Sequence, residues 1–495
     1  MAGKATSKPS KAPKPKPAKR SKSPAKPKAR AAAAKKAAKI RKAAAPKPSA
    51  PARSVGSPKV RSGDADLSVA GQIYQRGKLA PGILHIDTAS GRIVRVSKST
   101  ALDEHLDFGK KVLLPGALDL HVHFREPGHT HKEDFLSGST SAAFGGVTGF
   151  VDMPNTLPAT TTLRAAKDKL ALAASKSVVD YAVWAGGTWY TQELPDMLKV
   201  CAGVKTYLGA STGDLLLEDI GRLQAILSAA ATAGKPVVLH AEAQRVLQQL
   251  RRSEAGVADH DQLRPPLAEV EAIYDAMKAV AAIKKAPVVH IAHAASTDAI
   301  QAATAAKFST GVCPHHLLLD TDAPLRHAYG KMNPPLRSPA AREALWKVFA
   351  AGKIPILESD HAPHTSVEKE DNFHAAPSGV PGVETMMPLL LAQAKAGHVD
   401  LRTVVDAATV NPAALIGASD RGALEPGLRA DFAVYEWKPT KVDEDNLHSK
   451  CGWSPFDGHN AIFPSHTFLA GRAVMEEHEL VAAAGSGRSI LPLKL

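Results

Sequence analysis

The sequence predicts an α/β fold: a (β/α)8 barrel joined to a small β domain, which is formed by the segments before and after the barrel. Between residues 116 and 419, apolar strand-like segments alternate with Ala/Leu-rich segments of helical spacing. This alternation is typical of parallel β/α barrels. Shorter strand-like runs with glycine-containing turns flank that region on both sides and predict the β domain.

The elements can be placed in order along the chain. Residues 64–115 contain the strand-like runs LSVAGQIY, GILHIDT, RIVRVSK and KKVLLPG. The barrel strands are expected at 117–124, 147–154, 178–186, 204–209, 236–242, 287–294, 308–316 and 354–363. Helices are expected at 160–175, 217–233, 266–284, 296–306 and 339–350. Strand-like patterning returns at 429–437 and 465–480, so residues 420–495 are expected to pair with 64–115 and complete the small domain.

Charge divides the chain into two parts. The whole sequence has 62 Lys+Arg against 48 Asp+Glu, a formal charge of +14. Residues 1–63 contain 20 of the basic residues and no acidic residue, so the body has 42 basic against 48 acidic groups, a balance of −6. We expect residues 1–63 to be a disordered, basic Lys/Ala/Pro-rich tail. Three interpretations of the tail stay open: a solvated extension, a segment that contacts nucleic acid or another polyanion, and an organellar targeting segment.

Composition excludes several classes of protein. Apolar residues make up 44% of the chain, which is enough for a large core. No run approaches the roughly 20 apolar residues of a membrane span, so no membrane association is expected. The three cysteines, Cys201, Cys313 and Cys451, are far apart and form no CxxC motif. Together with an N-terminus that lacks an apolar signal core, this spacing favours a cytoplasmic protein in a reducing compartment.

Candidate metal ligands occur where predicted barrel strands end. His121 and His123 are two apart in a strand and therefore point to the same side. His240, His293 and Asp360 end three further strands. Because the catalytic groups of barrel enzymes lie at the C-terminal ends of the strands, these side chains are expected to meet. Imidazole and carboxylate ligands without thiolate favour zinc or a similar divalent ion.

Lys205 lies on the fourth predicted strand, in the segment VKTYLG. A buried ammonium is costly unless it is paired, so one interpretation is an ion pair with a nearby carboxylate. The alternative is that the neutral amine adds carbon dioxide, because a buried lysine loses its proton readily. The resulting carbamate is anionic and can bridge two metal ions.

Several long motifs resemble those of dihydroorotases in the amidohydrolase superfamily. They are DLHVHFREPGHTHKEDFLSGSTSAAFGGVTGFVDMPNT, GVKTYLG, VVLHAE, HIAH, CPHHLLL, KMNPPLRS, ESDHAPH and GVPGVETMMPLLL, in that order. The resemblance covers roughly residues 66–480 and implies a metal-dependent hydrolase barrel with two divalent metal ions, most simply Zn²⁺. It implies that His121, His123 and Asp360 bind one ion, that His240 and His293 bind the other, and that carboxylated Lys205 bridges them.

The resemblance also implies a substrate. Arg125, in HFREPG, can pair bidentately with a carboxylate. Dihydroorotate carries a carboxylate, whereas dihydrouracil, hydantoin and allantoin do not. The alternative is a structural role, in which Arg125 forms an ion pair with Glu126 or Glu133. The other expected substrate contacts are Asn155, Asn333, His364, Ser378 and Gly379.

The implied activity is the reversible hydrolysis of (S)-dihydroorotate to N-carbamoyl-L-aspartate in de novo pyrimidine (UMP) biosynthesis, through a hydroxide activated by the two metals. Asp360 is expected to move the proton. Partners would then be this small-molecule pair, with a homo-oligomer and docking to another pathway enzyme left open. The alternatives are an allantoinase or dihydropyrimidinase-like cyclic amidohydrolase, and an inactive homologue that acts as a binding partner.

Overall fold

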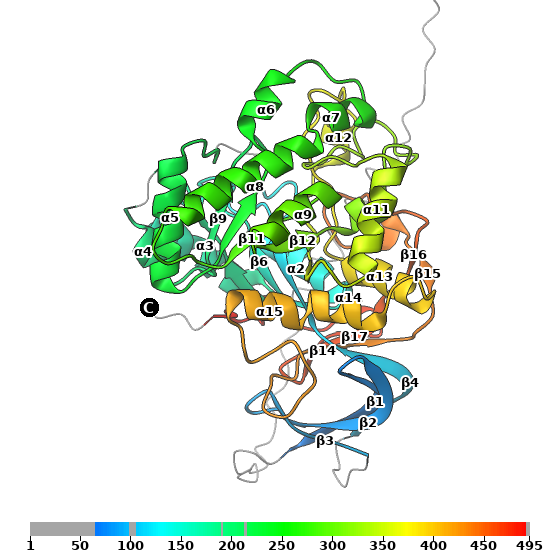
Figure 1. The fold of residues 1–495 in the computed structure, drawn as a ribbon. Helices are drawn as coiled ribbons and strands as arrows, with labels where there is room; N and C mark the ends of the chain where they lie inside the picture. The colour runs from blue at the N-terminus through cyan, green and yellow to red at the C-terminus, as the bar shows by residue number, and fades with distance from the viewer. Residues whose placement is uncertain (1–64, 99–104, 190–191, 212–214, 492–495) are drawn as a thin grey trace, which may run out of the picture. The chain divides into compact units, whose positions relative to one another are not determined.

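Parallel strands form a closed barrel in the structure, a computed structural model that describes residues 65–98, 105–189, 192–211 and 215–491 (Figure 1). Its strands are β5 (Ala117–Val122), β6 (Val147–Asp152), β7 (Asp180–Val183), β8 (Ala185–Gly186), β9 (Val204–Tyr207), β10 (Val237–His240), β11 (Val289–Ile291), β12 (Ser309–Val312) and β13 (Ile356–Leu357). Each lies within a segment predicted to be a barrel strand.

The barrel is closed by contacts between its first and last strands. One sheet has the order β5-β6-β7 and another β8-β9-β10-β11-β12-β13, and every pairing in both is parallel. β7 and β8 are separated only by Trp184, so they join the two sheets. At the other end, Val122 bridges to His361, and the backbone N–H of His123 donates to the His361 carbonyl at 2.8 Å. The predicted fold class is confirmed.

Helices cover the outside of the barrel (Figure 1). Those within predicted helical stretches are α3 (Leu163–Lys176), α5 (Ile220–Ala233), α8 (Pro266–Ala281), α9 (Thr297–Ala305) and α11 (Pro339–Ala350). Those not predicted are α2 (Phe135–Phe144), α4 (Leu194–Met197), α6 (Gln244–Gln249), α7 (Val257–Leu263), α10 (Pro314–Leu318), α12 (Ser366–Lys369), α13 (Met386–Lys395), α14 (Leu401–Ala408) and α15 (Val410–Ile416).

Tertiary burial explains why two of these helices were missed. α2 has the sequence FLSGSTSAAF, whose serines and glycine disfavour a helix interior. The helix nevertheless forms, because it is almost wholly buried and is capped by Asp134, which accepts from the Ser137 N–H in a capping box. α13 is apolar along most of its length and therefore shows no amphipathic period.

A separate sheet outside the barrel contains strands from both of the barrel's flanks. Its order is β19-β18-β17-β14-β4-β1-β2-β3. The strands are β1 (Leu67–Gln75), β2 (Lys78–Asp87), β3 (Arg92–Ser97), β4 (His105–Pro115), β14 (Phe432–Tyr435), β17 (Pro464–Leu469), β18 (Arg472–Glu476) and β19 (Glu479–Leu480). β14 pairs antiparallel with β4, which joins the early and late strands. Phe432 and Phe468 stack in its core, with ring centroids 4.5 Å apart.

Parts of the C-terminal flank lie against the barrel instead of in this sheet. Residues 487–490 pair with the start of β7, where the Tyr181 N–H donates to the Arg488 carbonyl at 3.0 Å. A short ribbon of β15 (Thr440–Lys441) and β16 (Asn460–Ala461), with a 3-10 turn at Glu444–Asn446, also belongs to this flank. The domain boundaries at 64–115, 116–419 and 420–495 stay predictions.

A buried ion-pair network fixes β7 to the segment before β14. Asp180 is fully buried, and its Oδ2 accepts from Arg421 at 2.9 Å and from Arg429 at 3.0 Å. We expect Arg421→Met to lower the free energy of unfolding by about 3–5 kcal/mol, because the variant leaves buried Asp180 and Asp431 with one guanidinium between them. Urea denaturation checks this. An exposed pair serves as the control: Arg164→Met, which breaks the contact with Asp168, should change stability by about 0.5 kcal/mol or less. Equal effects of the two substitutions would contradict the prediction.

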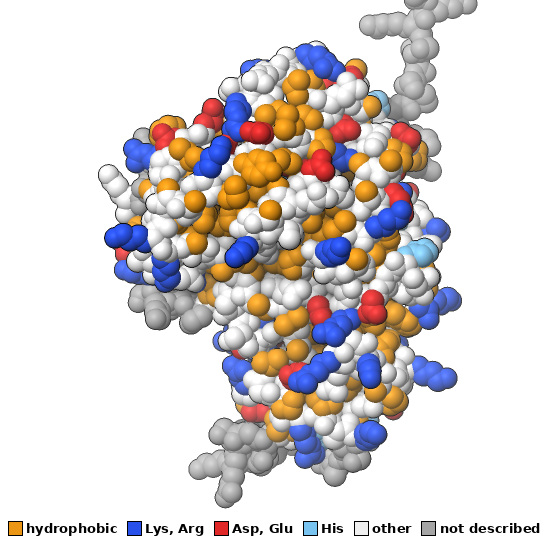
Figure 2. All heavy atoms as spheres, in the orientation of Figure 1, with side chains coloured by type: hydrophobic (Ala, Val, Ile, Leu, Met, Phe, Trp, Pro, Cys, Tyr) orange, Lys and Arg blue, Asp and Glu red, His pale blue; other side chains and the backbone are white. Residues whose placement is uncertain are grey.

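The predicted tail, residues 1–63, lies outside the described residues. None of the described helices combines the length and apolar character that a membrane span requires. Acidic and basic side chains both occur on the face drawn in Figure 2, with apolar side chains between them. Exposed apolar residues include Leu267, Tyr274 and Met277 of α8.

Candidate metal centre and active-site cavity

Asp360 contacts two histidines, His121 in β5 and His123 directly after this strand. Its Oδ1 lies 3.3 Å from His121 Nε2 and 3.2 Å from His123 Nε2. The other ring nitrogen of His123, Nδ1, lies 2.7 Å from Asn155 Oδ1. Asn155 thus fixes the His123 tautomer with the proton on Nδ1, so that the lone pair of Nε2 faces Asp360.

A second pair of histidines lies beside the first. His240 Nδ1 is 3.2 Å from His293 Nε2, and the rings of His293 and His121 have centroids 4.9 Å apart. Donor atoms of His121, His293 and Asp360 lie within 4.8 Å of one another. The predicted ligands from four different strand ends therefore meet at one place.

Lys205 projects into the same interior from β9. It is completely buried, and its Nζ has no hydrogen-bond partner among the described residues. Burial lowers the pKa of Lys205 to about 8, while the carboxylates of Glu358 and Asp360 act in the opposite direction. The ion-pair interpretation of Lys205 therefore has no partner within 4.0 Å in the described part of the chain. A buried amine with a lowered pKa is suited to react as a neutral nucleophile.

Burial also sets the charge of the other groups. It lowers the pKa of His121 to about 4 and holds the pKa values of His123 and His293 well below their usual range. The imidazoles are therefore neutral at pH 7, the state in which histidine binds metals. Burial raises the pKa of Asp360, and the neighbouring His121 and Lys205 oppose this shift.

Three site residues have left-handed backbone conformations that non-glycine residues seldom adopt. The φ angles are 63° at Arg125, 40° at His293 and 45° at Asp360. Such conformations cost roughly 1–3 kcal/mol each and persist only where surrounding structure enforces them. All three lie just after the ends of β5, β11 and β13. This indicates that the strained backbone at these strand ends serves to direct the side chains into the site.

Glu358 is a buried carboxylate that the sequence analysis missed. Its Oε2 lies 3.5 Å from His121 Nδ1 and 3.7 Å from His290 Nε2, and its Oε1 accepts from the backbone N–H of His293. The carboxylate thus contacts one predicted ligand through its ring and another through its backbone. Gly311 leaves the space for it, because a Cβ at that position would collide with Glu358 Oε1.

Glu242 is a second buried carboxylate that contacts a predicted ligand, His240. Its Oε2 lies 2.8 Å from His240 Nε2, and Arg264 donates to the carboxylate from behind at 3.0 Å. A signal for both carboxylates was present in the sequence. Glu242 follows His240 by two residues and Glu358 precedes Asp360 by two, the same spacing that linked His121 with His123.

A cavity opens beside these groups and contains most of the predicted substrate contacts. It is lined by His121, His123, Arg125, Asn155, Tyr207, Ser211, His293, Asn333, Asp360, Ala362, Ser378 and Gly379. Arg125 is 3% exposed, and its Nε donates to the Pro363 carbonyl at 3.1 Å. The two carboxylates considered as ion-pair partners of Arg125 are engaged elsewhere within the described residues. Glu126 pairs with Lys176, and Glu133 accepts a hydrogen bond from Ser137.

His364 is the one predicted substrate contact that does not line this cavity. Its Nε2 lies 3.1 Å from Arg125 Nη2 and 3.0 Å from the Ser378 carbonyl, and Lys132 Nζ lies 3.0 Å from its Nδ1. Burial and the charges of Arg125 and Lys132 hold the pKa of His364 well below its usual range. A neutral ring that accepts from Lys132 carries its proton on Nε2 and donates it to Ser378. His364 therefore holds the Ser378 backbone and lies beside Arg125, from which its protonated Nε2 accepts no hydrogen bond.

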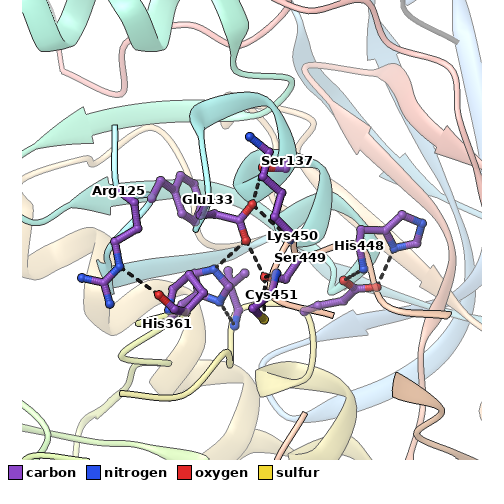
Figure 3. Close-up of polar contacts among 12 residues, drawn as sticks. Arg125, Glu133, Ser137, His361, His448, Ser449, Lys450 and Cys451 are labelled. Carbon is purple, nitrogen blue, oxygen red and sulfur yellow. Dashed lines mark hydrogen bonds and ion pairs between the residues drawn. The ribbon is translucent and has the colours of Figure 1, made fainter. Parts of the chain in front are cut away.

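The C-terminal segment 448–453 lies behind the site and contacts it through Glu133. Figure 3 shows the Glu133 carboxylate between His361, Ser137 and Ser449. Ser449 donates to Glu133 at 2.5 Å, and His361 Nε2 lies 3.5 Å from the same oxygen. His361 follows Asp360 directly, so residues far apart in the sequence combine to hold the end of the last barrel strand.

A separate buried group lies after β12. Donor atoms of Cys313, His315 and His316 lie within 4.8 Å of one another. His316 Nε2 lies 2.9 Å from the Pro334 carbonyl.

A sequence model of the amidohydrolase family matches residues 112–463. The chain belongs to the amidohydrolase family. Relatives within it include proteins named dihydroorotase. That of Halobacterium salinarum is 38% identical over 78% of this chain and 92% of its own length. Those of Methanosarcina acetivorans and Thermoplasma acidophilum are 34% and 37% identical, each over 84% of this chain and over 93% and 95% of their own.

Solved structures of the same fold support the membership. The L-hydantoinase (dihydropyrimidinase) from Arthrobacter aurescens superposes with a TM-score of 0.81 at 27% identity, over 86% of this chain and 99% of its own. A dihydropyrimidinase from Brevibacillus agri has a TM-score of 0.78 at 24% identity, over 86% of this chain and 98% of its own, and shows the fold alone.

The amidohydrolase family is metal-dependent, and the residues present here fit a metal centre. Zinc bound at about 2.0–2.2 Å with tetrahedral geometry places its ligand atoms roughly 3.3–3.5 Å apart. The contacts of Asp360 with His121 and His123, at 3.3 and 3.2 Å, are close to that spacing. The donors are neutral imidazoles and carboxylate, and the buried Nδ1 of His293 has no hydrogen-bond partner among the described residues.

Proposed function

We propose that this chain is a dihydroorotase, which catalyses the reversible hydrolysis of (S)-dihydroorotate to N-carbamoyl-L-aspartate in pyrimidine synthesis. The observation that carries the proposal is the position of Arg125. Its guanidinium lines the same cavity as His121, His123 and Asp360. A substrate for this cavity would need a cyclic amide to be hydrolysed at the metal site and a carboxylate to pair with Arg125. Dihydroorotate has both groups. The identity with several dihydroorotases supports the same conclusion.

Two metal ions, most simply Zn²⁺, would be held by the predicted ligands. His121, His123 and Asp360 would hold one, His240 and His293 the other, and Lys205, carboxylated on Nζ, would bridge them. When bound, such ions lower the pKa of a water molecule and polarise the carbonyl that it attacks. The buried Nζ of Lys205, which has no hydrogen-bond partner among the described residues, supports the carboxylation.

The other side chains of the cavity bind and orient the substrate. Arg125 would pair with the carboxylate, and its Nε is held from behind by the Pro363 carbonyl. Asn155 lines the cavity and accepts from His123 through its Oδ1, and its side-chain amide would contact the substrate. Asn333 lines the cavity, its Oδ1 lies 2.9 Å from His260 Nε2, and its amide nitrogen would contact the ring. The backbone of Ser378 and Gly379 would border the ring edge.

Asp360 would move the proton. Its Oδ1 contacts the two β5 histidines, so its second oxygen is the atom that would accept the proton from the attacking water. Burial raises the pKa of this carboxyl group, which makes it a better base than an exposed aspartate. The same oxygen would then return the proton to the ring nitrogen as the amide bond breaks.

The test is a panel of cyclic amides given to the purified, metal-loaded protein. The proposal predicts ring opening of dihydroorotate and at least about a hundredfold lower kcat/KM for dihydrouracil, hydantoin and allantoin, because these lack the carboxylate. The second candidate is a hydantoinase or dihydropyrimidinase, favoured by the similarity to the Arthrobacter aurescens structure. Faster turnover of hydantoin or dihydrouracil than of dihydroorotate would favour that candidate and contradict ours.

Metal retention provides a separate prediction at Glu358. Glu358→Gln keeps the shape of the side chain but removes the charge beside His121 Nδ1, so we expect metal affinity to fall by about 10–100-fold. Competition with a chromogenic chelator measures this without any assay of activity. The matched control is Glu384→Gln. Glu384 is also a buried glutamate, but its carboxylate pairs with His448 at 2.8 Å and not with any of the predicted ligands. Equal metal affinity in Glu358→Gln and the wild type would contradict the assigned role.

We also propose that the basic tail contacts a polyanion, in a cytoplasmic enzyme. The support is the charge of residues 1–63, which contain 20 Lys or Arg and no acidic residue. The full chain should elute from immobilised DNA or heparin at higher salt than a version that begins at Asp64. Equal elution would contradict the proposal. A homo-oligomer and docking to a pathway enzyme stay predictions, which sedimentation and co-purification can test.

A further inference from the structure

The segment between α12 and Val380 borders the cavity but has no helix or strand of its own. Its residues Ser378 and Gly379 line the cavity, whereas residues 370–377 run along the outside of it. A loop of this kind needs bonds from elsewhere to hold its backbone in one position. The bonds come from a lysine that the proposed mechanism does not use.

Lys369, the last residue of α12, donates from Nζ to three backbone carbonyls. They belong to Lys331, Pro377 and Gly379, and each is 3.0 Å away. An ammonium has three N–H donors, so these bonds satisfy the group completely. The side chain is fully buried, and within the described part of the chain it is in no ion pair. Burial lowers the pKa of Lys369 to about 7, and the charges of Lys331 and Arg125 act in the same direction.

Two of these three carbonyls enclose the cavity-lining residues. The Pro377 carbonyl belongs to the peptide unit before Ser378 and the Gly379 carbonyl to the one after Gly379, so one ammonium holds both ends of this pair. The Gly379 N–H also donates to the Lys331 carbonyl, which itself accepts from Lys369. Gly379 has a φ of 135°, and a Cβ there would lie 2.6 Å from the Ala362 carbonyl. The backbone at this position is therefore tightly packed between Lys369 on one side and the cavity on the other.

Lys331 holds the outer part of the same segment and provides a comparison. Its Nζ donates to the carbonyls of Phe373 and His374 at 2.8 and 3.0 Å and pairs with Glu254 at 2.6 Å. Neither Phe373 nor His374 lines the cavity. Two buried lysine side chains thus hold one segment, but only the ammonium of Lys369 bonds to the part that lines the cavity, whereas Lys331 reaches Gly379 through its backbone carbonyl.

We propose that Lys369 is a positioning residue for substrate binding, which sets the backbone of Ser378 and Gly379 against the ring of the bound cyclic amide. The inference rests on the proposed function, since it assigns the ring of dihydroorotate to this backbone. Lys369 does not touch the substrate. It acts through three carbonyls, so its loss should affect binding of the ring more than the chemistry at Asp360.

The experiment compares Lys369→Met with Lys331→Met in the metal-loaded protein. Methionine has a similar length and volume but no donor. We expect Lys369→Met to raise KM for dihydroorotate at least tenfold while kcat stays within threefold and the metal content is unchanged. Lys331→Met should lower the melting temperature but leave KM within threefold. Lys369→Arg retains the charge and places it farther from the backbone, so it should also raise KM and is the variant to use if Lys369→Met does not fold.

The outcomes separate this inference from the proposed function. Wild-type protein that does not open dihydroorotate removes the proposed function itself. Wild-type protein that is active, with KM unchanged in Lys369→Met or Lys369→Arg, removes the positioning role of Lys369 alone. A KM that rises equally in the Lys369 and Lys331 variants would show a general loosening of the segment and would also overturn the inference.

Discussion

Replacing Asp360 by asparagine is expected to lower kcat for dihydroorotate by about 10³-fold, the range of effect for a group that moves a proton in the transition state. Asparagine keeps an oxygen that can lie near His121 Nε2 and His123 Nε2, the two atoms that contact Asp360 Oδ1 at 3.3 and 3.2 Å. It cannot accept and return a proton. Much of the metal should therefore stay bound while turnover is lost. Steady-state kinetics together with metal analysis of the same sample check this.

Asp119 supplies the matched control for that substitution. It is buried in the same barrel, and its Oδ1 accepts from the backbone N–H groups of His121 and Ser359 at 3.1 and 3.2 Å. Burial raises the pKa of Asp119 to about 7. Asp119→Asn keeps the acceptor oxygen, so kcat should fall far less than in Asp360→Asn. An Asp360→Asn protein with full metal content and kcat within tenfold of the wild type would show that another group moves the proton.

Replacing Arg125 by methionine is expected to lower kcat/KM for dihydroorotate by about 10²–10³-fold. Two charge-assisted hydrogen bonds to a carboxylate are worth about 3–4 kcal/mol together, and each 1.4 kcal/mol is a factor of ten. The loss should be specific to substrates with a carboxylate, so any slow ring opening of dihydrouracil should change little. Kinetics with both substrates measure the difference.

Lysine at the same position separates charge from shape. Arg125→Lys keeps the positive charge but cannot form the planar, two-pronged contact, so its kcat/KM should lie between those of the wild type and Arg125→Met. Arg125 has a left-handed backbone and is buried, so the thermal stability of both variants must be compared as well. Normal hydrolysis of dihydroorotate by Arg125→Met would contradict the assignment of substrate.

The barrel and the predicted ligands could be inferred from the sequence because both depend on local patterns. A buried parallel strand is a continuous apolar run, and its last residues point into the site. His121, His123, His240, His293 and Asp360 all end such runs, and the structure brings them together as two contacting sets, one around Asp360 and one of His240 with His293, which adjoin at His121 and His293. The family resemblance then supplied the roles that spacing alone left open, above all that of Lys205.

The supports of the site could not be inferred in the same way. Glu358 and Glu242 each lie two residues from a predicted ligand, but this spacing does not show which histidines their carboxylates contact. Lys369 acts on carbonyls of residues 331, 377 and 379, which have no sequence signature as acceptors. Ser449 reaches Glu133 from a segment more than 300 residues later in the chain. Contacts of this kind depend on tertiary packing, which local propensity and periodicity do not record.

The most direct test of the central claim is a crystal structure of the metal-loaded protein with N-carbamoyl-aspartate bound. The account predicts two metal ions between His121, His123, His240, His293 and Asp360, continuous density for a carboxylated Lys205 between them, and a ligand carboxylate on the guanidinium of Arg125. A free Lys205 ammonium beside two metal ions would contradict the bridge. A ligand bound with its carboxylates away from Arg125 would contradict the assignment of this cavity to dihydroorotate.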